Sequence, residues 1–142
     1  MPNDLSAEAV TNAAANLAGV VRRTPLELSE RLSDRAGAPV LLKREDQQLC
    51  RSYKVRGAFH TISSLDASER ARGVVCASAG NHGQGVAFSC QRLGIKGTVV
   101  VPSTTPRQKR QRIEALGAGW VELVTAGSSY DEADAAARED AA

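Results

Sequence analysis

The sequence predicts an α/β fold in which helices cover a parallel sheet. From Gly73 onward, short apolar runs rich in β-branched residues alternate with helical patterns, and such alternation forms right-handed crossovers between parallel strands. Glycine or proline follows most of these segments, as expected where strands and helices end. The 142 residues suit one domain, and 42% hydrophobic residues are enough for a core.

The first half of the chain is expected to be mainly helical. We expect helices over residues 6–19, 26–35 and 52–62, and a strand over residues 39–42. The first helix follows from its run of alanines, the best helix formers. Gly37 would close the second helix, and Ser52 would cap the third.

The second half is expected to repeat strand, turn and helix. We expect strands over residues 74–77, 98–101 and 120–124, and helices over residues 84–93, 105–117 and from 129 onward. Thr105 would cap the middle helix, with Pro106 at its first position. Ser129 and Glu132 form a capping box that begins the last one.

Charge and cysteine content exclude several classes of protein. The net charge of +2 is too small to favour nucleic acid or an anionic membrane, and no stretch approaches the ~20 apolar residues of a membrane helix. Residues 1–8 lack the basic start and apolar run of a signal peptide. We therefore expect a cytoplasmic protein whose three cysteines are reduced thiols.

One lysine, Lys54, lies where a predicted helix begins. The positive end of the helix dipole opposes a charged amine there. The same field, with Arg56 and Lys43 nearby, favours the neutral amine that a Schiff-base lysine needs. On position alone, a solvent-exposed lysine is the simpler interpretation, so a functional interpretation needs a second feature.

That second feature is the segment Ser78–Gly85, which directly follows a predicted strand and opens a helix. Its glycines allow a ligand to approach the backbone, and the free N–H groups of a helix start favour a carboxylate or phosphate. Their spacing is G-x-x-G-x-G, which disfavours a dinucleotide site. A tight turn is the structural alternative, but Asn81 and His82 place polar donors at the mouth of the sheet.

The remaining polar residues are interpreted as structural. The basic residues of one predicted helix are Arg107, Lys109, Arg110 and Arg112. We expect them to form a solvated face, because 4% aromatic residues are too few for a nucleic-acid interface. His60 and Cys50 have no evident catalytic partner, and the cysteine spacing predicts no metal site.

These features stand in an order known from one family. The segments concerned are Arg23–Leu26, Leu42–Asp46, Ser52–Ala58, Ser78–Gly85, Val99–Pro102, Thr105–Lys109 and Leu116–Ala118. Together they resemble the fold-type II pyridoxal-phosphate (PLP) enzymes, specifically the threonine dehydratases, over nearly the whole chain. Ala79 stands where similar racemases place a serine, which favours elimination over racemisation.

The resemblance implies the cofactor, the reaction and the roles of several residues. PLP would be held by Lys54 as a Schiff base, and the same lysine would remove the substrate α-proton. Asn81 would hydrogen-bond the 3′-oxygen of the cofactor, and the loop that binds the substrate carboxylate would include Ser78, Gly80, Asn81 and His82. The implied reaction converts L-threonine to 2-oxobutanoate and ammonia, the first step of isoleucine biosynthesis, in a homotetramer.

The resemblance also implies a division of the chain. Residues 1–56 would belong to the large, cofactor-binding domain, and residues 57–142 to a small, three-layer, Rossmann-like α/β domain. No run of glycines in the sequence could hold the cofactor phosphate, and the last helix reaches Ala142 without a stop signal. We therefore expect an amino-terminal fragment, incomplete at its carboxyl end and inactive alone.

Other functions remain to be weighed. A serine dehydratase would share this chemistry, and the sequence does not separate the two substrates. A non-catalytic α/β binding module would ignore PLP, but it would have no need for Lys54 and Asn81. A nucleotide-binding domain needs an acidic residue after its second strand, where this chain has Pro102 and Ser103.

Overall fold

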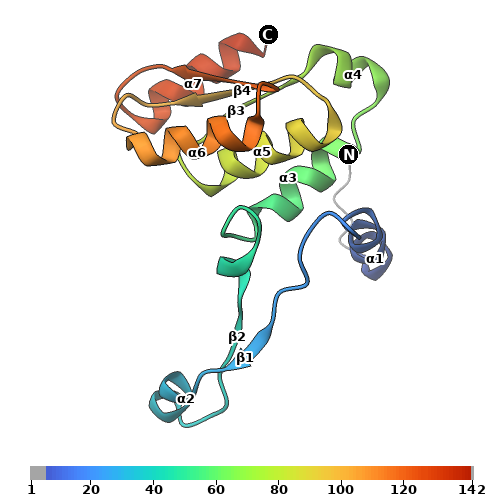
Figure 1. Ribbon diagram of the computed structural model, residues 1–142, viewed down its shortest axis with the longest axis vertical. Coiled ribbons are helices and arrows are strands. Elements are labelled where there is room, and N and C mark those ends of the chain that lie inside the picture. The colour runs from blue at the N-terminus through green and yellow to red at the C-terminus, as the bar shows by residue number, and fades with distance from the viewer. Residues whose placement is uncertain (1–5, 142) are drawn as a thin grey trace.

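The computed structural model describes residues 6–141 and contains two separate sheets (Figure 1). The main body holds a parallel sheet of β3 (Val74–Ala77), β4 (Gly97–Val101) and β5 (Val121–Thr125), in that order. The predicted parallel α/β fold is therefore confirmed. Residues 1–5, on which the expectation about a signal peptide partly rests, and Ala142 lie outside the described residues.

Helices cover both faces of the parallel sheet. They are α5 (Asn81–Leu93), α6 (Arg107–Gly117) and α7 (Tyr130–Asp140), and a fourth helix, α3 (Lys54–Ser63), lies beside them. Side chains alternate along β4, so Val99 and Val101 pack beneath α5 and α6 with Ile113, while Val100 packs against α7. The helix α3 packs on α5 rather than on the sheet (Figure 1). This arrangement gives the three predicted layers and carries Lys54 toward the start of α5.

Side-chain caps are found at two of the predicted helix starts. Ser6 caps α1 (Ala7–Asn16) by accepting a hydrogen bond from the Ala9 amide, and Ser129 forms the predicted capping box of α7. A further helix, α4 (Ala67–Arg72), was not predicted, although Asp66 begins it with a capping box of its own. Across residues 6–141, no helix has both the length and the apolar character needed to cross a membrane.

An arm projects from the body and differs from the prediction (Figure 1). Its elements are β1 (Leu26–Leu28), α2 (Glu30–Ala36), β2 (Leu41–Lys43) and the 3-10 helix η1 (Glu45–Gln47). The predicted helix over residues 26–35 is wrong for residues 26–28, because these pair antiparallel with β2. Backbone pairing with a distant segment here overrides local helix propensity.

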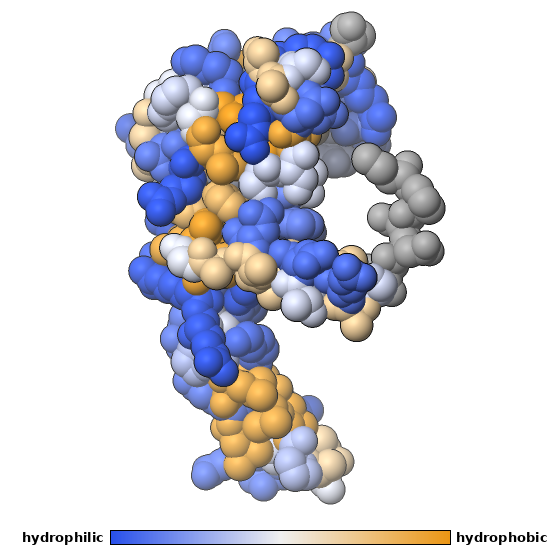
Figure 2. Space-filling view, turned by 90° about the vertical axis from the view of Figure 1, so that its right-hand side faces the viewer, coloured by the Kyte–Doolittle hydropathy of each residue, from blue (hydrophilic) through white to orange (hydrophobic). Residues whose placement is uncertain are grey.

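The arm carries an exposed hydrophobic surface. Its apolar side chains are Leu26, Leu28, Leu41 and Leu42, of which the first three are more than half exposed. Figure 2 shows the resulting hydrophobic patch on the lower part of the molecule. Exposed apolar patches of this kind mark surfaces that normally contact other protein.

The start of α6 departs from the predicted capping. The helix begins at Arg107 with Pro106 in the capping position, and Thr105 makes no cap. Thr105 is instead 4% exposed, and within the described part of the chain its hydroxyl has no hydrogen-bond partner. A buried hydroxyl without a partner costs stability, because it has lost its bonds to water.

Thr105→Val is therefore expected to raise the free energy of unfolding by about 1 kcal/mol. Valine keeps the shape of the side chain and removes the unpaired hydroxyl. Urea unfolding of the 142-residue chain measures the change. The neighbouring variant Thr104→Val is the control and should not stabilise, because Thr104 is exposed and donates to the Ser128 carbonyl oxygen. Equal effects of the two substitutions would contradict the explanation.

Candidate active site

Lys54 is the first residue of α3 and is exposed to solvent. Ser52 does not occupy the capping position as predicted, since Tyr53 does, but the Ser52 hydroxyl accepts a hydrogen bond from the Lys54 amide at 3.3 Å. The Lys54 amine lies 5.3 Å from the centre of the Tyr53 ring. An amine held at a helix start and open to solvent is accessible to a carbonyl compound.

The glycine turn forms at the carboxyl end of β3. The Ser78 hydroxyl accepts hydrogen bonds from the Gly80 amide at 3.3 Å and the Gly83 amide at 3.0 Å. Helix α5 begins inside the predicted turn, at Asn81. Among residues 6–141, the amides of Asn81 and His82 have no acceptor. These two donors, at the positive end of a helix, favour an anionic ligand.

The two segments meet where α3 crosses α5. Gly85 makes this approach possible, because a Cβ atom there would lie 3.2 Å from the Lys54 carbonyl oxygen. Partial burial lowers the pKa of His82, and the nearby positive charge of Lys54 lowers it further. A groove of about 240 Å³ between α3, α5 and β3 includes Gly57 and His82. The structure thus packs the backbone of Lys54 against α5, with the Lys54 amine near enough to His82 for its charge to act there.

A network anchors the first turn of α3 to the arm. Arg56 donates two hydrogen bonds to the Glu45 carboxylate, at 2.9 Å and 2.8 Å, and Thr24 donates a third. The Arg56 ion pair is the main reason that the pKa of Glu45 falls to about 2. Glu45 is largely buried, with 16% of its side chain exposed. The network fixes Arg56, and with it the turn that carries Lys54.

Glu45→Gln is expected to destabilise the chain by roughly 2 kcal/mol at pH 7. The folded pKa of Glu45 lies below its ordinary value of about 4.3, so this stabilisation is complete above that value. It is lost as the pH falls toward 2. Urea unfolding between about pH 3 and pH 7 should show the difference between wild type and variant shrinking with acid. The exposed Glu114→Gln is the control, and a pH-independent difference for Glu45 would contradict the explanation.

One residue of the predicted solvated face has a different role. Arg112 donates to the Gln84 side-chain oxygen and to the Leu49 carbonyl oxygen, both at 3.2 Å. The prediction is wrong at this position, because one acceptor comes from the turn before α3 and the other from α5, and no local pattern places either near α6. Arg107 and Lys109 remain exposed, as predicted.

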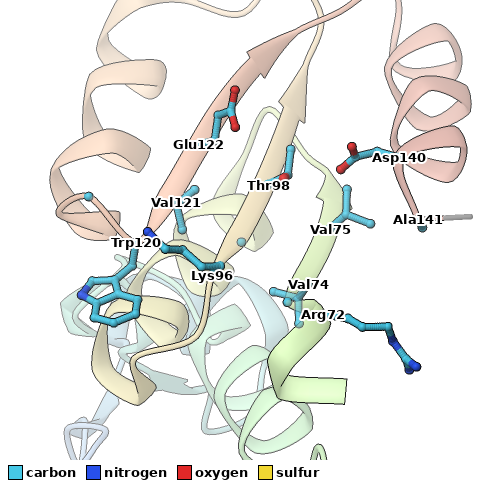
Figure 3. A pocket seen from close by; sticks show the side chains of 13 residues that line it. Arg72, Val74, Val75, Lys96, Thr98, Trp120, Val121, Glu122, Asp140 and Ala141 are labelled. Carbon is cyan, nitrogen blue, oxygen red and sulfur yellow. The ribbon is translucent and has the colours of Figure 1, made fainter. Parts of the chain in front are cut away.

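A larger hollow lies elsewhere in the body. It encloses about 550 Å³ at the amino ends of the strands and is bordered by Lys96, Trp120 and Glu122 (Figure 3). Lys96 lies 5.4 Å from the centre of the Trp120 ring. Ligands of open α/β sheets bind at the carboxyl ends of the strands, so the glycine turn that follows β3 is the better candidate. No group of three or more potential metal ligands occurs in residues 6–141.

Comparison with curated proteins connects this geometry to known enzymes. A family model described as "Pyridoxal-phosphate dependent enzyme" matches residues 17–142. The biosynthetic L-threonine dehydratase of Mycobacterium tuberculosis is 52% identical over 136 residues, which make up 96% of this chain and 32% of that protein. The Bacillus subtilis enzyme of the same name is 47% identical over 130 residues, 92% of this chain and 31% of that protein. The chain thus spans about a third of the length of these relatives.

Solved structures agree with the fold. The processed form of threonine deaminase isoform 2 from Solanum lycopersicum is 41% identical, with a TM-score of 0.76 over 94% of this chain and 40% of that chain. Maize serine racemase is 27% identical, with a TM-score of 0.85 over the same shares of the two chains. Both comparisons include the arm and the body, since they cover nearly all of this chain.

Proposed function

This chain belongs to the family of pyridoxal-phosphate dependent enzymes, and we propose that it is the amino-terminal third of an L-threonine dehydratase. The predicted resemblance to the family is confirmed by the family match. The observation that carries the proposed function is the close packing of the Lys54 segment on α5, the helix whose first amides, those of Asn81 and His82, are free. An amine and an anion site in this arrangement suit an amino-acid substrate and an aldehyde cofactor.

The residues present fit one end of PLP and the substrate. Lys54 offers an exposed amine for the aldehyde carbon. Asn81 is exposed at the start of α5, where its carboxamide would donate to the 3′-oxygen of the cofactor. When bound, PLP supplies an electron sink that makes the α-proton of an amino acid removable. The exposed leucines of the arm support the proposal that a longer polypeptide completes the site.

The chain's own residues would bind the substrate and move its proton. The amides of Asn81 and His82 would hold the carboxylate and orient the α-carbon toward Lys54, whose free amine takes the proton. His82, with its lowered pKa, stays neutral near pH 7 and donates a hydrogen bond without carrying charge. Ala79 presents a methyl group in this loop, so no hydroxyl returns a proton at that position, which favours loss of the β-hydroxyl as water over racemisation.

A chimeric enzyme tests the proposed function. This chain would replace the matching third of the Mycobacterium tuberculosis L-threonine dehydratase, with which it shares 52% identity. The chimera is expected to release 2-oxobutanoate from threonine, whereas the 142-residue chain alone should not. An inactive but folded chimera, or robust turnover by the chain alone, would contradict the proposal. The ratio of kcat/KM for threonine and serine distinguishes a serine dehydratase.

Several finer proposals rest on the same resemblance. We propose a division into residues 1–56 of a large domain and residues 57–142 of a small domain, which the two separate sheets support. We also propose a cytoplasmic homotetramer acting in isoleucine biosynthesis. Size-exclusion chromatography of the chimera with light scattering tests the assembly, and cell fractionation tests the location.

A further inference from the structure

The turn before Lys54 is strained. Arg51 has a backbone φ of 53°, in the left-handed region that residues other than glycine rarely adopt. Within this turn, residues 48–53, the structure has one backbone–backbone hydrogen bond, from the Arg51 amide to the Gln48 carbonyl oxygen. A strained turn keeps its shape only where contacts from outside hold it.

Arg112 supplies such contacts from α6. Its guanidinium bonds the Leu49 carbonyl oxygen in this turn and the Gln84 side chain in α5, both at 3.2 Å. Gln84 is 6% exposed, and the buried Cys50 thiol lies 3.6 Å from the Gln84 carbonyl oxygen. One cation therefore bridges the turn that leads into α3 and the first turns of α5.

We propose that Arg112 is a positioning residue, which sets the spacing between Lys54 and His82 by tying the turn before α3 to α5. Its meaning for catalysis rests on the proposed function, but the spacing itself does not depend on a cofactor. A planar guanidinium suits the task because two of its N–H groups reach two acceptors at once. Lysine, with a single ammonium, would hold one acceptor well.

The pKa of His82 reports the spacing, because burial lowers this pKa and the charge of Lys54 lowers it further. The chain has two histidines, so NMR titration of the 142-residue chain resolves both imidazoles, with His60→Asn to assign them. Arg112→Met is expected to raise the pKa of His82, as is Lys54→Met. Arg110→Met removes the same charge from the same helix and should leave it unchanged.

Two variants separate positioning from the direct effect of the Arg112 charge. Arg112→Lys keeps the positive charge. Under the proposal it still raises the pKa of His82, but by less than Arg112→Met does. In the Lys54→Met background, Arg112→Met should cause no further rise, since Lys54 carries the effect. Hydrogen exchange of the amides at residues 49–54 should accelerate about tenfold in Arg112→Met.

An unchanged His82 pKa in Arg112→Met and Arg112→Lys would overturn the proposal. So would additive shifts in the double variant, which would assign the effect to the charge alone. If Arg112→Met does not fold, Arg112→Lys decides. The proposed function is tested separately, by trapping PLP on the wild-type chain with borohydride and locating it at Lys54. Each proposal can therefore fail without the other.

Discussion

Lys54→Ala in the chimeric enzyme is expected to reduce threonine turnover by about 10²- to 10⁴-fold, the contribution of a general base. The same substitution should change the free energy of unfolding of the 142-residue chain by less than about 0.5 kcal/mol. Lys54 is exposed at a helix start, where the helix dipole opposes its charge. Its removal therefore takes away an amine that the proposed reaction needs and little that holds the fold together.

The combination of lost turnover and kept stability identifies a chemical role. Lys109→Ala is the matched control, because Lys109 is an exposed lysine in the first turn of another helix, α6. Its removal should leave both turnover and stability unchanged. Steady-state release of 2-oxobutanoate and urea unfolding are the two measurements. Turnover within about threefold of wild type in Lys54→Ala, far short of the loss of a general base, would remove Lys54 from the proposed mechanism.

Local sequence patterns predicted most of the helices and strands of the main body. The strands of the parallel sheet and the capping box at Ser129 depend on residues close together in sequence, and they stand within a residue of where they were predicted. The glycine turn also follows β3 as predicted, but it is shorter, because α5 begins at Asn81. The Lys54 segment and the Ser78–Gly85 segment were also identified. Their contact was not derivable from spacing, since it depends on Gly85 allowing α5 to approach the Lys54 backbone.

Features that depend on distant partners could not be predicted from the sequence. Residues 26–28 form a strand only because β2 lies beside them. Arg112 resembles its solvated neighbours on α6 until the fold brings the Leu49 carbonyl oxygen within 3.2 Å of it. Thr105 has the identity of a cap but is buried by tertiary packing. In each case local chemistry was compatible with two environments, and long-range packing selected one.

Gly83→Ala is expected to cost about 1–3 kcal/mol of unfolding free energy, the range for overpacking a well-packed site. A Cβ atom there would lie 2.6 Å from the Ser78 carbonyl oxygen and 3.1 Å from a methyl group of Val99. The carbonyl belongs to the backbone at the end of β3, so it cannot rotate away as a side chain would. Relief requires the loop to move, which lengthens the bond from the Gly83 amide to the Ser78 hydroxyl.

Gly57→Ala is the matched control, and we expect it to change the free energy of unfolding in the opposite direction. Gly57 lies inside α3, and a Cβ atom added there would have no other atom within 4 Å. Gly57→Ala should therefore stabilise the chain by about 0.5–1 kcal/mol through helix propensity. Urea unfolding compares the two variants directly. If Gly83→Ala is neutral, the loop is not held as tightly as its contacts indicate. If it destabilises as expected, turnover in the chimera should fall as well, because the same movement displaces the amides of Asn81 and His82.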